Sequence, residues 1–552
     1  MKKYILLCLT LVAMLPAWAQ AEHSFSVSKN LDIFNNLYRQ LDVFYVDSLD
    51  ADKLMRIGID AMLQSLDPYT EYYAEEDMGD LKMMTTGKYG GIGALIRMRK
   101  DSTKMIAEPY KGMPAADAGL HPGDIISKID NKVITKDMKL DEVTELLRGE
   151  PGTTFVLQVM RQGVSKPIEA KITRRNVKTE AIPYYGMLDE KTGYISFIKF
   201  TEGCAKEMRK DIIALKESGA KQLVLDLRNN LGGLLDEAVN IVNLFVPKDI
   251  TILETKGKVS TSDKTYATGS DPLDLDIPLV VLVNEETASS AEIVSGSLQD
   301  LDRAVIIGSK TYGKGIVQGT RELPYNGGLK LTTSKYYIPS GRCVQAIDYK
   351  RLREEDEAAR AGKTIAPKDS VKHIFHTAGG REVTEGSGIK PDIETKRDTM
   401  ANIVAYLGVD EVLTDWGTKY QGKHATIPEV KDFAVTDADF ADFKQFVKER
   451  DFKYDRQSEK RLADLKKVAK FEGYYDDAKD EFDALEKKLA HNLDREMDRQ
   501  EKDIRKLLAV EIVKRYYYQA GASEEALKGD TDVEKAISVL NNSAEYNKIL
   551  GK

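Results

Sequence analysis

The sequence predicts a multidomain α/β protein, with a central segment of alternating strands and helices and with helical regions at both ends. Three observations support this fold class. The chain has 552 residues, more than one hydrophobic core can organise. Short apolar runs alternate with amphipathic segments between about residues 194 and 307, as expected for strands joined by crossover helices. Beyond Arg397 the chain mixes charges of both signs with apolar residues at helical spacing.

The elements of the central segment, which we assign to residues 177–397, follow from its hydrophobic pattern. Short apolar runs indicate strands, whereas apolar residues three and four positions apart indicate helices. The predicted strands are 194–200, 222–227, 279–283 and 304–307, and the predicted helices are 202–217 and 234–245.

Two helical regions flank this segment. Residues 22–86 contain LDIFNNLYRQLDVFY, which has helical spacing and is followed by a turn at Asp67-Pro68. Residues 398–552 are expected to form long, solvated helices that pack on one face. They fit either a plain helical appendage or a coiled-coil or partner-binding surface. Either helical region could also mediate assembly of a homo-oligomer.

The N-terminus has the pattern of a signal peptide over residues 1–21. Lys2 and Lys3 precede a short apolar core, and small residues follow, so that cleavage is expected near Ala19 or Ala21. A buried first helix is the alternative. No later segment reaches membrane length, so we expect no integral membrane segment after cleavage and an exported, periplasmic protein.

Composition excludes some functions. The formal net charge is -8, which argues against nucleic acid as a partner because its binders concentrate basic surface. After signal removal only Cys204 and Cys343 remain. They could pair or stay as free thiols, and they form no disulfide framework.

The stretch NEETASSAEIVSGSLQD, residues 284–300, follows an apolar strand and contains Ser289 and Ser290. One interpretation is structural, because Ser289 and Glu292 fit a capping box at a helix start. The other is that Ser289 is a nucleophile. No GxSxG motif occurs, and no histidine lies in a triad-like context. His373 and His376 lack the acidic partners of a metal motif, so we expect no metal and no cofactor.

Two glycine-containing segments supply partners for a nucleophilic serine. In TYGKGIVQ, Lys314 stands between Gly313 and Gly315, whose lack of side chains lets the backbone pass close to a site. A buried lysine can lose its proton and act as a base. In LDLRNNLGGLL, Gly232 and Gly233 follow a strand, and their amides could hold an oxyanion. A surface lysine and a tight turn are the structural alternatives.

Taken together, these motifs resemble those of the C-terminal processing peptidases, serine peptidase family S41, which use a Ser–Lys dyad and carry a PDZ domain. The family's nucleophile motif reads approximately N-x-x-S-A-S-A-S/A-E, and this chain matches it with Asn284, Thr287, Ala288, Ser289, Ser290, Ala291 and Glu292. Thr287 and Ser290 depart mildly from the pattern. The resemblance covers about residues 66–394 and implies a crossover α/β core of the ClpP/crotonase-like type.

The resemblance also implies roles for individual residues. Ser289 is the nucleophile, Lys314 the base, and Gln318, in the G-K-G-x-x-Q pattern and expected one helical turn further on, orients the amine. The amide of Gly232 or Gly233, together with the Ser290 N–H, forms the oxyanion hole. Asp300 has a supporting position.

Residues 87–176 resemble a PDZ domain inserted before the peptidase core. In KYGGIGALI, the backbone of Gly91, Ile92, Gly93 and Ala94 matches the loop that binds a peptide's terminal carboxylate. PAADAGLHPGDIISKIDNKVI continues the pattern, with a helix ending at Gly119, and TFVLQVMR and PIEAKITRR are strand-like.

The sequence therefore predicts an exported serine endopeptidase that acts on proteins and peptides with free C-termini. The alternative from another class is a PDZ-based binding scaffold with a degenerate peptidase core, against which the complete set of Ser289, Lys314 and Gln318 argues. A hydrolase for small esters would not need a loop for a peptide tail.

Overall fold

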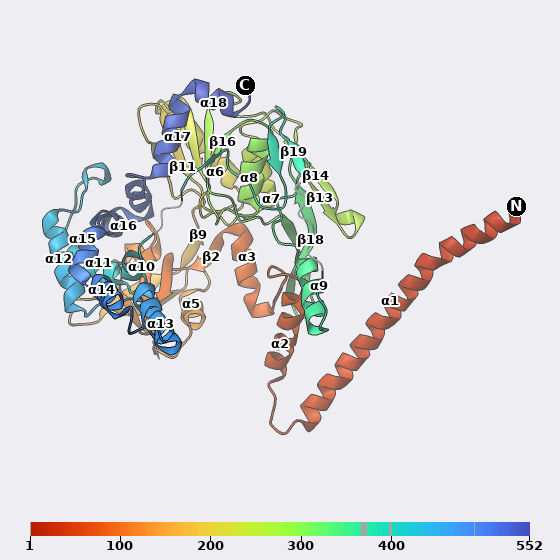
Figure 1. Cartoon of the computed structure of the whole chain (residues 1–552), viewed down its shortest axis with the longest axis horizontal. Coiled ribbons are helices and arrows are strands. Elements are labelled where there is room, and N and C mark those ends of the chain that lie inside the picture. The colour runs from red at the N-terminus through yellow and green to blue at the C-terminus, as the bar shows by residue number, and fades with distance from the viewer. Residues whose placement is uncertain (1, 366–372, 397–399, 491) are drawn as a thin grey trace. The chain divides into compact units, whose positions relative to one another are not determined.

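The computed structural model describes residues 2–365, 373–396, 400–490 and 492–552, with side chains from residue 23 onward (Figure 1). The chain divides into two compact units. The first comprises Met1–Glu75, Gln318–Leu331 and Tyr349–Ile365, and the second Glu76–Val317, Thr332–Asp348 and Ala366–Lys552. The second unit contains Ser289, Lys314 and both glycine-rich loops.

The first unit is mainly helical, with α1 (Lys2–Phe44), α2 (Ala51–Gln64) and α9 (Tyr349–Arg360). Strand β1 (Glu71–Tyr73) pairs antiparallel with the start of β18 (Gly328–Tyr337). Among the described residues, no helix combines the length and the apolarity that a bilayer crossing requires.

The centre of the second unit is a six-stranded sheet in the order β10-β11-β12-β15-β16-β21. All neighbours are parallel except β10, which pairs antiparallel with β11 at one edge. The strands are β10 (Tyr184–Met187), β11 (Thr192–Ser196), β12 (Gln222–Asp226), β15 (Leu279–Val283), β16 (Val305–Gly308) and β21 (Ile393–Glu394). The predicted strands are thus confirmed, but β11 ends before residue 200. Phe200 instead forms an isolated bridge with Gly233.

Helices cover both faces of this sheet, which explains the continuous apolar runs of its strands. Alternate residues such as Leu223, Leu225 and Val281 pack beneath α6 (Cys204–Glu217), α7 (Leu235–Val242) and α8 (Ser290–Asp300). The residues between them, such as Val224 and Val280, pack against α17 (Thr531–Asn541) and α18 (Ser543–Ile549). The end of the chain therefore completes the core around the central sheet, a role that neither interpretation of the C-terminal region included (Figure 1).

A smaller sheet in the order β3-β4-β5-β7-β8 precedes the central sheet in the chain, and β3 is an edge strand. Strands β2 and β9 pair antiparallel where the chain enters and leaves this segment. The elements are β2 (Lys88–Gly91), β3 (Ala94–Met98), β4 (Lys104–Pro109), α4 (Pro114–Asp117), β5 (Ile125–Ile129), β6 (Lys132–Val133), α5 (Leu140–Leu147), β7 (Thr154–Met160), β8 (Ile168–Thr173) and β9 (Arg175–Lys178). The predicted helix before Gly119 and both predicted strands are confirmed.

Five of the remaining C-terminal helices share a hydrophobic core of their own, centred on residues such as Trp416, Phe443 and Ile512. They are α10 (Asn402–Val409), α11 (Val412–Lys423), α12 (Asp437–Glu449), α15 (Leu493–Arg499) and α16 (Glu501–Ala526). Helices α13 (Gln457–Glu472) and α14 (Lys479–Leu489) contribute no residue to this core. Cys204 and Cys343 are free thiols, so the pairing alternative is excluded.

Candidate active site

Ser289 lies at the turn between β15 and α8 and has an unusual backbone conformation, with φ 55° and ψ -118°. Positive φ is uncommon for a residue other than glycine and costs about 1–3 kcal/mol. The turn is held by hydrogen bonds from Asn284 N–H to Thr287 Oγ1 and from Ala288 N–H to Asn230 O, both 2.9 Å long. A sharp, strained strand-to-helix turn is also what exposes the nucleophilic serine of α/β-hydrolases.

Glu292, one turn into α8, is fully buried and holds this serine turn against the lysine loop. Its Oε2 accepts the N–H groups of Ser289 and Lys314 at 2.9 and 2.8 Å. Its Oε1 accepts the Gly313 N–H at 2.7 Å and the Thr311 hydroxyl at 2.6 Å. Burial raises the pKa of Glu292, and the four hydrogen bonds oppose that rise. The capping interaction expected from the sequence is therefore one of four hydrogen bonds through which Glu292 joins the serine turn to the lysine loop.

The lysine loop lies between β16 and β17 (Ile316–Glu322) and is closely packed on both sides of Lys314. A Cβ atom on Gly313 or Gly315 would come within 2.5 or 2.6 Å of neighbouring atoms, so only glycine fits there. The buried hydroxyl of Tyr336 donates to the carbonyl oxygens of Lys314 and Ser289, at 3.0 and 3.3 Å. The backbones of the two predicted dyad residues thus share both a carboxylate and a phenol.

The glycine pair after β12 approaches the same serine. A Cβ atom on Gly232 would lie 2.8 Å from Ser289 Cβ and 2.9 Å from Ser290 N. The Gly232 N–H donates to Asn230 Oδ1 at 2.8 Å, and the Ser290 hydroxyl donates to the Gly233 carbonyl at 2.9 Å. Within the described part of the chain, the N–H groups of Gly233 and Ser290 have no acceptor. These two amides can therefore receive a developing oxyanion.

Gln318 lies on strand β17, so the expectation that it follows Lys314 by one helical turn is wrong. Gly315 separates the lysine from an extended, strand-forming sequence, and the chain continues into a hairpin with β18 rather than into a helix. In an extended chain, residues four apart still face the same side.

The residues predicted to bind a carboxylate form the connection between β2 and β3. Gly91 ends β2, Ile92 is buried, Gly93 has φ 68°, and Ala94 begins the edge strand β3. No acceptor for the N–H groups of Ile92 and Gly93 is found among the described residues. Helix α5 lies beside β3, so the loop opens onto an edge that could pair with an added peptide strand.

Arg228, in the loop between β12 and the glycine pair, was not singled out from the sequence. It forms ion pairs with Asp226 at 2.6 Å, with Asp530 at 2.9 Å and with Asp532 at 3.2 Å. The last two residues come from the start of α17. The C-terminal region therefore fixes the position of the loop that contains Gly232 and Gly233, which we call the glycine loop. The pattern LDLRNN contains the arginine, but no local signal identifies partners three hundred residues away.

Asp300, the last residue of α8, bonds to the segment that follows β18. It forms a fully buried ion pair with Arg342 at 2.8 Å and accepts the Ser340 N–H at 3.0 Å. It therefore fixes the segment after β18 rather than the serine turn itself.

Family models match three parts of the chain. "Peptidase family S41" matches residues 191–350, "PDZ domain" matches residues 105–161, and a model for the C-terminal helical domain of a PDZ-protease matches residues 403–540. The last match covers a region outside the resemblance found from the motifs.

Similar proteins carry related names. The chain is 38% identical over 323 residues to the carboxy-terminal-processing protease of Bartonella bacilliformis, covering 58% of this chain and 73% of the relative. It is 37% identical over 319 residues to a CtpA-like serine protease of Staphylococcus aureus strain COL, covering 57% of this chain and 62% of the relative. Among solved structures, the photosystem II D1 C-terminal processing protease is 24% identical, with a TM-score of 0.34 and coverage of 66% and 92% of the two chains.

The geometry predicts that Glu292 positions both loops. Glu292→Gln exchanges one of two acceptor oxygens for a donor that faces backbone N–H groups. We expect kcat to fall by roughly 100-fold, because small displacements of reacting groups are costly, while KM changes little. Asp439→Asn is the control for the loss of a capping carboxylate, since the partly exposed Asp439 also caps a helix, at Thr436, but lies on α12 and, within the described residues, has no bond to either loop. Steady-state kinetics of both variants would check this, and an unchanged kcat in Glu292→Gln would contradict it.

Proposed function

Because the chain belongs to the carboxy-terminal-processing proteases of serine peptidase family S41, we propose that it is an endopeptidase that cleaves polypeptides near their C-termini with a Ser289–Lys314 dyad. The observation that carries the proposal is the shared acceptor. The N–H groups of Ser289 and Lys314 both donate to Glu292 Oε2, so a hydroxyl and an amine start from adjacent backbone positions.

In this mechanism Ser289 attacks the scissile carbonyl and Lys314 accepts its proton, then returns it to the leaving amine. Water releases the acyl group afterwards. A free lysine amine has a pKa of about 10.4, so a base at neutral pH has to be desolvated toward about 7–8. The close packing around Gly313 and Gly315 fixes the backbone from which the amine starts, and Lys314 itself is partly buried. Gln318, on the following strand, is proposed to orient the amine.

The oxyanion is proposed to bind the N–H groups of Gly233 and Ser290. Of the two glycines, Gly233 is preferred because the Gly232 N–H is already bound to Asn230. Gly232 contributes by having no side chain where it meets Ser289. Two preorganised donors of this kind stabilise the tetrahedral intermediate more than the planar substrate.

The PDZ domain is proposed to select the substrate through its free C-terminus. The N–H groups of Ile92, Gly93 and Ala94 would bind the terminal carboxylate, Gly91 would let the loop turn from β2, and the peptide tail would pair with edge strand β3. Tail capture would raise the local concentration of the adjoining chain at Ser289.

The dyad is tested by Ser289→Ala and Lys314→Ala. Each should lower kcat/KM on an unstructured protein such as casein by roughly 10,000-fold, because removing one member of a catalytic unit costs nearly as much as removing all of it. The exposed serine at 218 and the exposed lysine at 310 provide the controls Ser218→Ala and Lys310→Ala, which should retain activity. Proteolysis that persists in Lys314→Ala would refute the dyad.

Tail recognition is tested by Gly93→Ala. The new Cβ would lie 2.4 Å from Met113 Cβ, so the loop has to move, and we expect roughly tenfold weaker binding of a peptide with a free C-terminus. Gly119→Ala is the control, because Gly119 also has positive φ but has nothing within 4 Å. Fluorescence anisotropy would measure both, with a C-terminally amidated peptide as reference. Equal affinity of the free and amidated peptides would argue against carboxylate capture.

Export to the periplasm is proposed from the signal-peptide pattern. We expect the mature chain to begin after Ala19 or Ala21, and N-terminal sequencing of the exported protein would check this. Retention of Lys2 and Lys3 on the active protein would contradict it.

A homo-oligomer is also proposed, because Leu31, Phe34 and Leu37 are all about half exposed along α1 and a second copy could cover them. Light scattering of the same preparation would measure its mass.

A further inference from the structure

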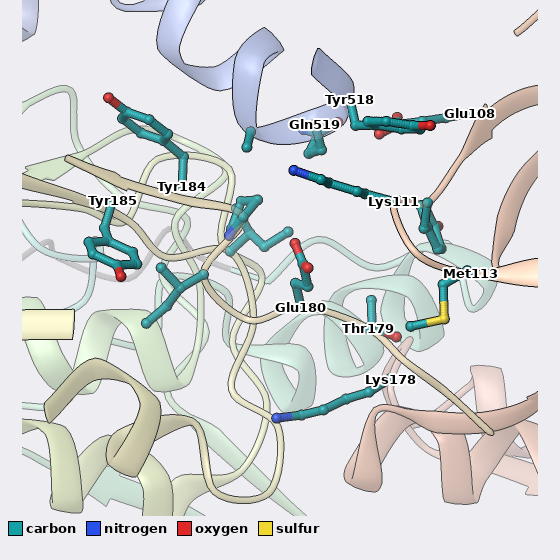
Figure 2. Close-up of a pocket in the computed structure, with 15 residues that line it drawn as sticks. Glu108, Lys111, Met113, Lys178, Thr179, Glu180, Tyr184, Tyr185, Tyr518 and Gln519 are labelled. Carbon is teal, nitrogen blue, oxygen red and sulfur yellow. The ribbon is translucent and has the colours of Figure 1, made fainter. Parts of the chain in front are cut away.

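A cavity of about 630 Å³ lies within the second unit, where four parts of the chain meet (Figure 2). We call it the junction pocket. Its walls come from the loop after β4 in the PDZ domain, from the segment linking β9 to β10, from Ile198 after β11, and from a kink in α16 at residues 518–520. A volume of this size is typical of ligand sites in proteins.

The position of the pocket connects the two sites proposed above. On one side lies the connection between β2 and β3, residues 91–94, which we call the carboxylate loop. The Tyr110 N–H donates to the Gly93 carbonyl at 2.9 Å, and Met113 packs on Gly93. On the other side, Ile198 is two residues before Phe200, whose N–H donates to the Gly232 carbonyl at 3.2 Å. A substrate that runs from the carboxylate loop to the glycine loop would therefore have this cavity between the two places where it is bound.

The chemistry of the walls matches a peptide. The Lys111 amine and the Glu180 carboxylate both point into the cavity (Figure 2), and neither has an ion-pair partner within 4.0 Å among the described residues. An extended peptide offers carbonyl oxygens to the amine and N–H groups to the carboxylate. The rest of the lining is largely apolar or aromatic, with Met113, Ile182, Pro183, Tyr184 and Ile198.

The kink in α16 distinguishes the pocket from an accidental packing gap. Tyr518 has φ 58° and ψ -157° inside an otherwise helical segment, a conformation that costs about 1–3 kcal/mol in a residue other than glycine. The side-chain amide of Gln519 lies against both carboxylate oxygens of Glu108, and with its nitrogen turned toward them it donates to both, at 2.6 and 3.1 Å. The strained turn at Tyr518 thus keeps α16 out of the pocket, and Gln519 holds α16 to the PDZ domain.

We propose that the junction pocket binds the part of the substrate polypeptide that lies between its PDZ-held tail and its scissile bond, and that it prefers a large aliphatic or aromatic side chain there. This inference rests on the proposed function and makes it more specific. The enzyme would then select substrates by an internal apolar residue as well as by the C-terminus.

The test uses the full chain carrying Ser289→Ala, so that peptides bind without being cut. Two fluorescein-labelled peptides share one C-terminal tail and differ in an upstream segment, which contains either Leu and Phe or only Gly and Ser. We expect the apolar segment to bind about tenfold more tightly, as a buried anchor residue does. Adding Ile198→Trp should fill the pocket and remove this difference. Ile213→Trp is the control, because Ile213 is 39% exposed on α6 and Ile198 is 41% exposed.

Photo-crosslinking gives a second measurement that does not depend on the folding of a variant. A photoreactive phenylalanine in the upstream segment should crosslink to residues 178–185 or 518–520. Crosslinks confined to β3 and α5, or equal affinity of both peptides for all three proteins, would overturn the proposal. Amidated versions of both peptides separate the two hypotheses. If amidation has no effect, tail capture fails, whereas the dependence on the upstream segment still reports on the pocket.

Discussion

A single buried carboxylate, that of Glu292, connects the parts of the proposed active site. A carboxylate is costly to bury unless donors surround it, and here three backbone N–H groups and the Thr311 hydroxyl do so. The same bonds hold Ser289 at positive φ and fix the loop that carries Lys314. Capping and catalysis are therefore not competing explanations of the serine turn. The Oε2 atom of Glu292 accepts N–H groups from both the start of α8 and the lysine loop, and so joins them.

The glycine loop depends on a second constraint, which comes from the end of the chain. Arg228 pairs with Asp226 at its own strand end and with Asp530 and Asp532 at the start of α17. Helices α17 and α18 also bury the second face of the central sheet. The position of the Gly233 amide thus depends on residues that lie outside the peptidase motifs. A family model for the C-terminal helices, matched over residues 403–540, agrees with an integral role for this region.

The sequence predicted the strands well because their apolar runs have one physical cause, burial on both faces. It also predicted which loops carry Ser289, Lys314 and the glycine pair, because short motifs encode them. Local patterns could not supply what depends on long-range contacts. Gln318 was expected on a helix but lies on β17, since the hairpin with β18 decides its conformation. The kink at Tyr518 and the partners of Arg228 have no signal in the neighbouring residues.

The PDZ domain is held against the C-terminal helices by charged groups that are mostly removed from solvent. Arg99 pairs with Glu411 at 2.9 Å and with Asp415 at 2.8 Å, and the buried Arg515 donates to the Pro122 carbonyl at 2.9 Å. Removing one partner of such a pair leaves an uncompensated charge and is costly. These contacts join the PDZ domain to the C-terminal region that also supplies Asp530 and Asp532, the partners of Arg228 beside the glycine loop. The C-terminal region is therefore bonded both to the PDZ domain and to the loop that follows β12.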